Sequence, residues 1–176
     1  MSAADRYLDQ AEALTLLAVA LPATDKRLVI FAGLATDALR ESFLVRATRR
    51  IDAVGYAGAR AGGSTQSTAF PRVGRNGDAV DPDPDEPTAP APPVTGVPRG
   101  VRIACALQAA TEAAAAAGVG AALHLQEAAN RGVVSQSVRG RSETVDARYA
   151  RSPWGRLCIE AKDELARYRR RSSAIV

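Results

Sequence analysis

Residues 98–118 read PRGVRIACALQAATEAAAAAG, and this stretch decides the fold of the chain. Proline suits the start of a helix, alanine has the highest helix propensity, and glycine commonly follows the last helical turn. Val101, Ala104, Cys105 and Gln108 recur at helical spacing within it. Because alanine is small, a neighbouring backbone can approach closely. The stretch therefore predicts the central packing helix of a bundle.

Two further helices are expected near the N-terminus. The first covers residues 2–21, with Ser2 as its cap and Asp5 completing a capping box, and Pro22 ends it. A short apolar stretch at residues 28–34 follows, and its helical surroundings favour one or two helical turns over a strand.

A third helix is predicted to begin after Thr36, which is a favourable N-cap residue, and to stop at Gly55. Its apolar residues share one face: Leu39, Phe43, Leu44, Ala47, Ile51 and Val54. Positive side chains crowd its last turns, where the helix dipole favours them: Arg46, Arg49 and Arg50.

The last predicted helix runs from Pro153 to Arg171, with Ser152 as its cap and Arg156–Glu160 as an outer ion pair. Its apolar face consists of Trp154, Leu157, Cys158, Ala161, Leu165 and Tyr168. A basic tail follows it.

Two segments between the helices have a different character. Residues 78–98 hold most of the chain's prolines and five acids, which predicts an extended, exposed loop within residues 73–98. Val133–Val138 and Ser142–Tyr149 read as two strands of a hairpin. A lone hairpin is marginal in water, so we expect this one to need a partner surface.

The expected fold class is therefore mainly α: a small helical bundle with a long Pro/Asp-rich loop, one β-hairpin at 133–149 and a C-terminal helix. We place the helical body at residues 1–151 and the C-terminal helix with its basic tail at 152–176.

Composition excludes several classes of protein. The 176 residues include 37 Ala but only 3 Phe, 1 Trp and 4 Tyr, which favours helices over an aromatic-rich sandwich. No apolar run approaches the length of a membrane span, and the N-terminus lacks the features of a signal peptide. A net charge of +4 is too small to indicate a nucleic-acid binder by itself.

No catalytic or metal-binding constellation emerges from the sequence. His124 is the one histidine, so it has no partner for a metal site or a nucleophile–base pair, and we interpret it as structural. Cys105 and Cys158 lie on apolar faces and are expected in the core. The acids of residues 81–86 lack the glycine and distal glutamate of a calcium loop. We therefore expect no enzyme activity, no metal and no cofactor.

Several short motifs resemble the head–tail connector proteins of tailed bacteriophages, also called adaptor or head-completion proteins. The opening Asp5-Arg6-Tyr7 and the helix end Ala47 to Asp52 are similar to that family. Residues 66–72, QSTAFPR, resemble its Gln-x-x-x-aromatic-Pro-Arg signature. Residues 77–82 and the Pro98-opened helix resemble the family's loop and next helix.

This resemblance implies a structural virion protein of the phage neck, assembled in the host cytoplasm. It would form a ring, dodecameric by analogy, that joins the portal protein to a downstream stopper or tail-terminator protein. Double-stranded DNA would pass through the ring without sequence-specific contacts, and no membrane would be involved.

The resemblance also suggests contact residues. Members of the family hold the portal with their C-terminal end, which here implies Arg167, Arg169, Arg170, Arg171, Ile175 and Val176. The hairpin supplies candidate contacts to a neighbouring subunit or another neck protein: Val134, Gln136, Val138, Arg139, Arg141, Thr144 and Arg148.

An alternative function stays open at this point. Some members of the family carry the label of a single-stranded-DNA-binding accessory protein resembling a primosomal component. That function needs basic grooves interleaved with stacking aromatic side chains. The few aromatic residues of this chain, several of them on predicted core faces, argue against it.

Overall fold

The computed structural model describes residues 6–56, 59–60, 66–73, 96–119, 135–138, 141–144 and 152–168. These residues are mainly helical, which confirms the predicted fold class. The helices are α1 (Gln10–Ala20), α2 (Lys26–Ala32), α3 (Asp37–Asp52), α4 (Arg99–Ala116) and α7 (Ile159–Leu165), with 3-10 turns η3 (Trp154–Arg156) and η4 (Ala166–Tyr168). The strands are β1 (Ala59–Arg60), β2 (Arg72–Val73), β3 (Ser135–Val138) and β4 (Arg141–Thr144), paired as two antiparallel ribbons, β1 with β2 and β3 with β4.

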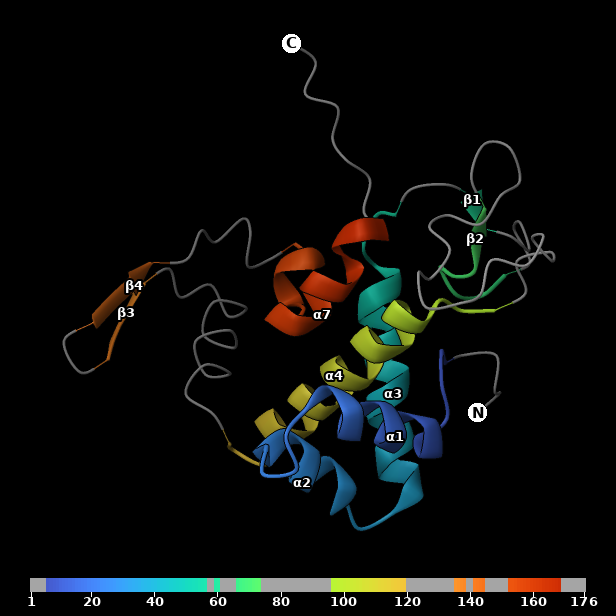
Figure 1. The fold of residues 1–176 in the computed structure, drawn as a ribbon. Coiled ribbons are helices and arrows are strands. Elements are labelled where there is room, and N and C mark those ends of the chain that lie inside the picture. The colour runs from blue at the N-terminus through green and yellow to red at the C-terminus, as the bar shows by residue number, and fades with distance from the viewer. Residues whose placement is uncertain are drawn as a thin grey trace.

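Helix α4 is the central packing helix, as its alanine content predicts. It contacts α1, α2, α3 and α7, and Figure 1 shows these helices gathered around it. Small side chains allow this because each neighbour can approach the α4 backbone without displacing a large group. The core residues that α4 contributes are Val101, Ala104, Cys105, Ala106, Leu107, Ala109, Ala110, Ala113 and Ala114.

Both ends of α4 confirm the expectations from sequence. Pro98 occupies the N-cap position, immediately before the first helical residue. Gly118 adopts a φ of 73° beyond the C-cap, in the left-handed region that favours glycine. The Val119 N–H donates to the Ala114 carbonyl oxygen at 2.9 Å, and the Gly118 N–H donates to that of Ala115 at 3.0 Å. This pair of hydrogen bonds closes the helix as a Schellman motif.

The start of α1 differs from the prediction. Its N-cap is Asp9, whose carboxylate accepts a hydrogen bond from the Glu12 N–H at 2.8 Å. Ser2 and Asp5 lie outside the described residues, and Tyr7 and Leu8 are buried ahead of the helix. The helix therefore begins about two turns later than expected, because a cap with the same spacing stands closer to the apolar run.

Helices α2 and α3 match their predictions closely. Asp25 caps α2, which begins two residues before the predicted stretch. Thr36 caps α3, as predicted, and its hydroxyl accepts a hydrogen bond from the Leu39 N–H at 3.2 Å. The predicted apolar face of α3 is buried, with the exception of Leu39, which is exposed near the N-terminal end.

The predicted single C-terminal helix is wrong at its first turns. Ser152 caps only the 3-10 turn η3, accepting from the Gly155 N–H at 3.0 Å. The chain is extended at Leu157 and Cys158, and α7 starts only after them. The predicted apolar face is nevertheless buried from Leu157 to Tyr168, with Trp154 half-buried.

This interruption also changes an ion pair. The predicted Arg156–Glu160 pair requires both residues on one continuous helix, which the extended residues 157–158 prevent. Glu160 pairs instead with Arg27 of α2, at 2.7 Å between Nη1 and Oε1. Residues 152–168, which we call the C-terminal unit, are thus bound to α2 as well as to α4.

Several sequence predictions fall outside the described residues. They are the loop at 78–95 and the side chain of His124.

Candidate interaction surfaces

The motif at residues 66–72 forms an aromatic cluster with three distant parts of the chain. Phe70 is 1% exposed, and its ring meets Tyr56, Tyr168 and Tyr7 edge-on, with centroid distances of 4.7, 5.4 and 6.1 Å. Tyr7 lies in the segment before α1, Tyr56 in the segment after α3, and Tyr168 in the last turn, η4. Phe70 therefore joins the N-terminal segment, the bundle and the C-terminal unit.

The polar residues of the same motif hold the turn around Phe70. The Gln66 amide donates from Nε2 to the carbonyl oxygens of Thr68 and Pro71, at 2.9 and 3.0 Å. Arg72 donates from Nη1 to the Ala69 carbonyl oxygen at 3.2 Å. The glutamine and the arginine of the motif therefore satisfy backbone oxygens of the motif itself, which presents Phe70 to the core.

Asp52 attaches this turn to the end of α3. Its Oδ1 accepts hydrogen bonds from the Tyr7 hydroxyl and, at 2.9 Å, from the Ala69 N–H. Burial raises the pKa of Asp52 above its ordinary value, although both hydrogen bonds and the charge of Arg60 favour the carboxylate. Burial and the neighbouring Asp52 charge likewise raise the pKa of Tyr7, so the hydroxyl remains the donor.

A second buried polar contact fixes the C-terminal unit to α4. The Gln108 side chain, 2% exposed, accepts from the Cys158 N–H at 2.8 Å and donates to Glu112 Oε1 at 3.0 Å. The same Glu112 oxygen pairs with Arg50 Nε at 3.0 Å. Arg50, Glu112, Gln108 and Cys158 form a chain of contacts that we call the polar seam. The extended backbone at Cys158 leaves its N–H without a helical acceptor, and Gln108 supplies one.

Both cysteines lie in the core, as predicted. Cys105 and Cys158 are free thiols. Burial raises the pKa of Cys105 to about 12, and it raises the pKa of Cys158 above its ordinary value. Each thiol therefore stays protonated at neutral pH and packs as a small apolar residue.

The exposed side of α3 carries arginines that sequence analysis attributed only to the helix dipole. Arg46 and Arg49 are exposed, and 40% of the Arg50 side chain is exposed. Arg50 also donates from Nη1 to the carbonyl oxygen of the exposed Arg156, at 3.4 Å, which brings η3 beside α3. We call Arg46, Arg49, Arg50 and Arg156 the basic strip. The i, i+3, i+4 spacing in α3 was visible in the sequence, but the approach of Arg156 was not.

The predicted hairpin is present in the described residues, and its second strand begins at Arg141, one residue earlier than predicted. Gln136 and Val138 lie in β3, and Arg141 and Thr144 lie in β4. The antiparallel register pairs Gln136 with Glu143, Val138 with Arg141 and Ser135 with Thr144. Figure 1 shows this ribbon away from the helical body. The remaining predicted contact residues, Val134, Arg139 and Arg148, lie outside the described residues, and contacts of the hairpin with a partner stay a prediction.

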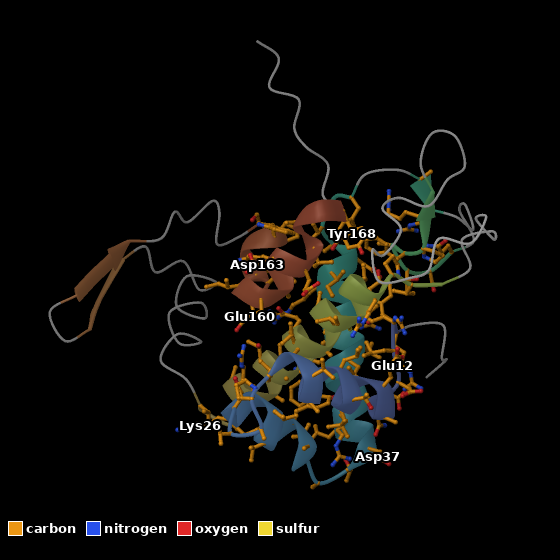
Figure 2. The ribbon with its side chains drawn as sticks, in the orientation of Figure 1. Glu12, Lys26, Asp37, Glu160, Asp163 and Tyr168 are labelled. Carbon is orange, nitrogen blue, oxygen red and sulfur yellow. The ribbon has the colours of Figure 1, made fainter. Side chains whose placement is uncertain are left out.

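The predicted portal contacts fall almost wholly beyond the described chain. Arg167 lies in η4, where the structure describes its backbone. Arg169, Arg170, Arg171, Ile175 and Val176 follow the last described residue. Tyr168, the last described residue (labelled in Figure 2), is buried against Phe70 of the aromatic cluster.

The described residues contain neither a cluster of metal ligands nor a membrane-spanning helix. Within the described ranges, no three His, Cys, Asp or Glu side chains gather closely enough to hold a metal ion. None of the described helices has the length and hydropathy that crossing a bilayer requires. No protein-family model, no curated protein and no solved structure matches the chain.

Proposed function

We propose that this chain is a structural protein of a tailed-phage neck, forming a ring that joins the portal to the tail and lets double-stranded DNA pass. The observation that carries the proposal is the turn at residues 66–72. Its glutamine, aromatic residue and arginine each have a structural role around Phe70, so the resemblance to the connector signature lies in residues that build this fold.

The central helix supports the same proposal. Resemblance to the family includes a proline-opened, alanine-rich helix, and α4 starts after Pro98 and packs on four other helices. Small residues at the centre give a compact body. The segments predicted to reach outward are the loop at 73–98, the hairpin at 133–149 and the tail after Tyr168, and in the proposed ring they contact neighbours.

The alternative function, binding of single-stranded DNA, is disfavoured by the aromatic side chains. Base stacking needs an exposed aromatic face. Within the part of the chain that the structure describes, Trp154 is half-buried and the other aromatic residues are buried: Tyr7, Phe31, Phe43, Tyr56, Phe70 and Tyr168. These side chains are committed to the core.

The decisive experiment measures the mass of the full chain in solution, alone and after mixing with portal rings from the same phage. Native mass spectrometry and negative-stain microscopy should detect a closed ring, either free or only on the portal. A chain that stays monomeric in both samples would contradict the proposal.

Two variants locate the contacts within that assay. Deletion of residues 134–148 should leave a folded helical monomer that no longer assembles, because the hairpin cannot pair on its own. Truncation after Tyr168 should preserve the fold and the ring but abolish attachment to the portal. Circular dichroism of both variants is the control for folding. A truncated chain that still binds portal rings with wild-type yield places the portal contact elsewhere.

A further inference from the structure

We propose that the basic strip, Arg46, Arg49, Arg50 and Arg156, binds the phosphate backbone of double-stranded DNA. The choice of duplex DNA as the ligand rests on the proposed function, and the inference adds the surface and the residues that make the contact. The sequence pointed to basic residues at the tail and assigned no ligand to these four.

The first argument is the absence of acidic partners along the strip. Asp52 is the one acid between Ser42 and Ala53, and its carboxylate is occupied by Tyr7 and Ala69. Glu112 is only 8% exposed, and its carboxylate forms an ion pair with Arg50 from the buried side of the strip. In the described structure, Arg46, Arg49 and Arg156 form no ion pair, which leaves three positive charges uncompensated.

Four other arginines of the body differ in this respect. Each is paired with a nearby carboxylate: Arg6 with Glu41, Arg27 with Asp25 and Glu160, Arg40 with Asp37, and Arg102 with Glu12. The charges of these four are therefore compensated, whereas three charges of the strip are not. Such a local surplus attracts a polyanion.

The second argument is geometric. A helix rises about 1.5 Å per residue, so the three strip arginines of α3 lie within about 6 Å along its axis. Arg156 lies beside this group, since the Arg50 guanidinium contacts the Arg156 carbonyl oxygen at 3.4 Å. A line of guanidinium groups suits a row of phosphates, because each group offers several N–H donors in a planar fork.

The third argument is that two of these side chains are held in place. The Arg46 guanidinium lies 4.3 Å from the centroid of the Phe43 ring, and its Nε donates to the Ser42 carbonyl oxygen at 3.4 Å. Arg50 is held by Glu112. Each contact uses some of the five guanidinium N–H donors and leaves others for a ligand. Pre-positioned side chains lose less conformational entropy when they bind.

A weak, sequence-independent contact follows from these features. Phosphate contacts carry no sequence information, and a small number of them gives an affinity that salt reduces strongly. A surface of this kind holds DNA in position while still letting it slide.

The test is a titration of the full chain against a fluorescent duplex of about 30 base pairs, at salt concentrations from about 20 to 200 mM. Each phosphate contact contributes about 0.9 to the slope of log K against log salt, so the three uncompensated arginines predict a slope of roughly −2.7. Arg49→Gln should reduce the magnitude by about 0.9, and Arg46→Gln/Arg49→Gln/Arg156→Gln by about 2.7.

Lys26→Gln is the matched control. Lys26 is exposed, has no ion pair in the described structure, and is the first residue of α2, outside the strip (labelled in Figure 2). Lys26→Gln removes one positive charge, as Arg49→Gln does, but should leave the slope of log K against log salt unchanged. The proposal is overturned if the wild-type chain shows no salt-dependent binding, or if the strip variants behave like Lys26→Gln.

Other outcomes assign the strip to a different ligand and equally overturn the proposal. Strip variants that keep the slope but lose ring formation or portal binding would make the strip a protein interface. Tighter binding of a single strand of the same length would favour the alternative function. The mass assay separates this inference from the proposed function: rings without strip-dependent DNA binding contradict only the inference, and strip-dependent binding without rings contradicts only the proposed function.

Discussion

Helix α3 has two sides that treat their polar groups in opposite ways. On the core side, Asp52 accepts from Tyr7 and Ala69, and the Thr48 hydroxyl lies 3.5 Å from the Cys105 sulfur. On the solvent side, Arg46 and Arg49 carry charges that no ion pair neutralises in the described residues. The difference separates two properties of the molecule: the core side supplies stability, and the strip supplies a charge available to a ligand.

The largest expected effect is on the core side. Phe70→Ala should lower the free energy of unfolding by about 3–5 kcal/mol, because it removes a buried ring and leaves a cavity among three tyrosines. Urea denaturation measures this change. Val29→Ala, at an exposed position of α2, is the control and should change stability by less than about 0.5 kcal/mol. A Phe70→Ala loss as small as that of the control would mean that the cluster does not hold the chain together.

A smaller loss is expected at the polar seam. Gln108→Ala leaves the Cys158 N–H without its acceptor and removes a donor from Glu112, which should cost about 1–3 kcal/mol. Gln10→Ala removes the same side chain from an exposed hydrogen bond to the Asp37 carbonyl oxygen. The same denaturation assay should find this control near the wild type, and equal losses at the two positions would contradict the role of the seam.

The pH dependence of stability tests Asp52. Its pKa is raised in the folded state, so its stabilising contribution is complete below the unfolded-state pKa and is lost as pH rises through the folded-state pKa. Asp52→Asn cannot titrate. The stability of the wild type relative to Asp52→Asn should therefore fall as pH rises from the acidic range towards neutrality, as measured by urea denaturation of both proteins. A relative stability that rises with pH would show that the hydrogen bonds outweigh burial.

The smallest stability effect is expected on the strip. Arg49→Gln and Arg156→Gln should each change the free energy of unfolding by less than about 0.5 kcal/mol, since exposed substitutions away from special features seldom do more. Arg46→Gln also loses the contact with the Phe43 ring and should cost up to about 1 kcal/mol. Thermal unfolding of the single variants checks this. Losses above about 1.5 kcal/mol would show that these arginines are structural and would remove the contrast between the two sides of α3.

Local signals explain the parts of the fold that sequence could predict. Pro98 and Thr36 mark the starts of α4 and α3, and Gly118 marks the end of α4, each through the backbone within a few residues. The small alanine side chains of α4 allow neighbouring helices to pack closely against it. The start of α1 was missed although its signal was equally local. Asp9 and Glu12 have the spacing of a capping box, but Ser2 and Asp5 offered a similar pattern earlier in the chain.

Long-range contacts explain what could not be predicted. At the interruption before α7, the Cys158 N–H donates to Gln108, which is 50 residues away in the sequence. The apolar spacing at residues 154–168 predicts a continuous helix and gives no indication of this contact. The strip depends on the approach of η3 to α3, which brings Arg156 beside Arg50. The motif at residues 66–72 is recognisable in the sequence, whereas nothing in the sequence indicates that Tyr7, Tyr56 and Tyr168 pack around its Phe70.

The hydrogen bond from Cys158 to Gln108 makes one amide a reporter of the C-terminal unit. An amide inside α7, such as that of Lys162, donates to a carbonyl of its own helix and exchanges its hydrogen with solvent when that helix frays. The Cys158 amide donates to a side chain of α4, so its hydrogen is released only when residues 152–168 separate from α4. The two exchange rates therefore distinguish fraying of one helix from undocking of the unit, within one molecule and without any mutation.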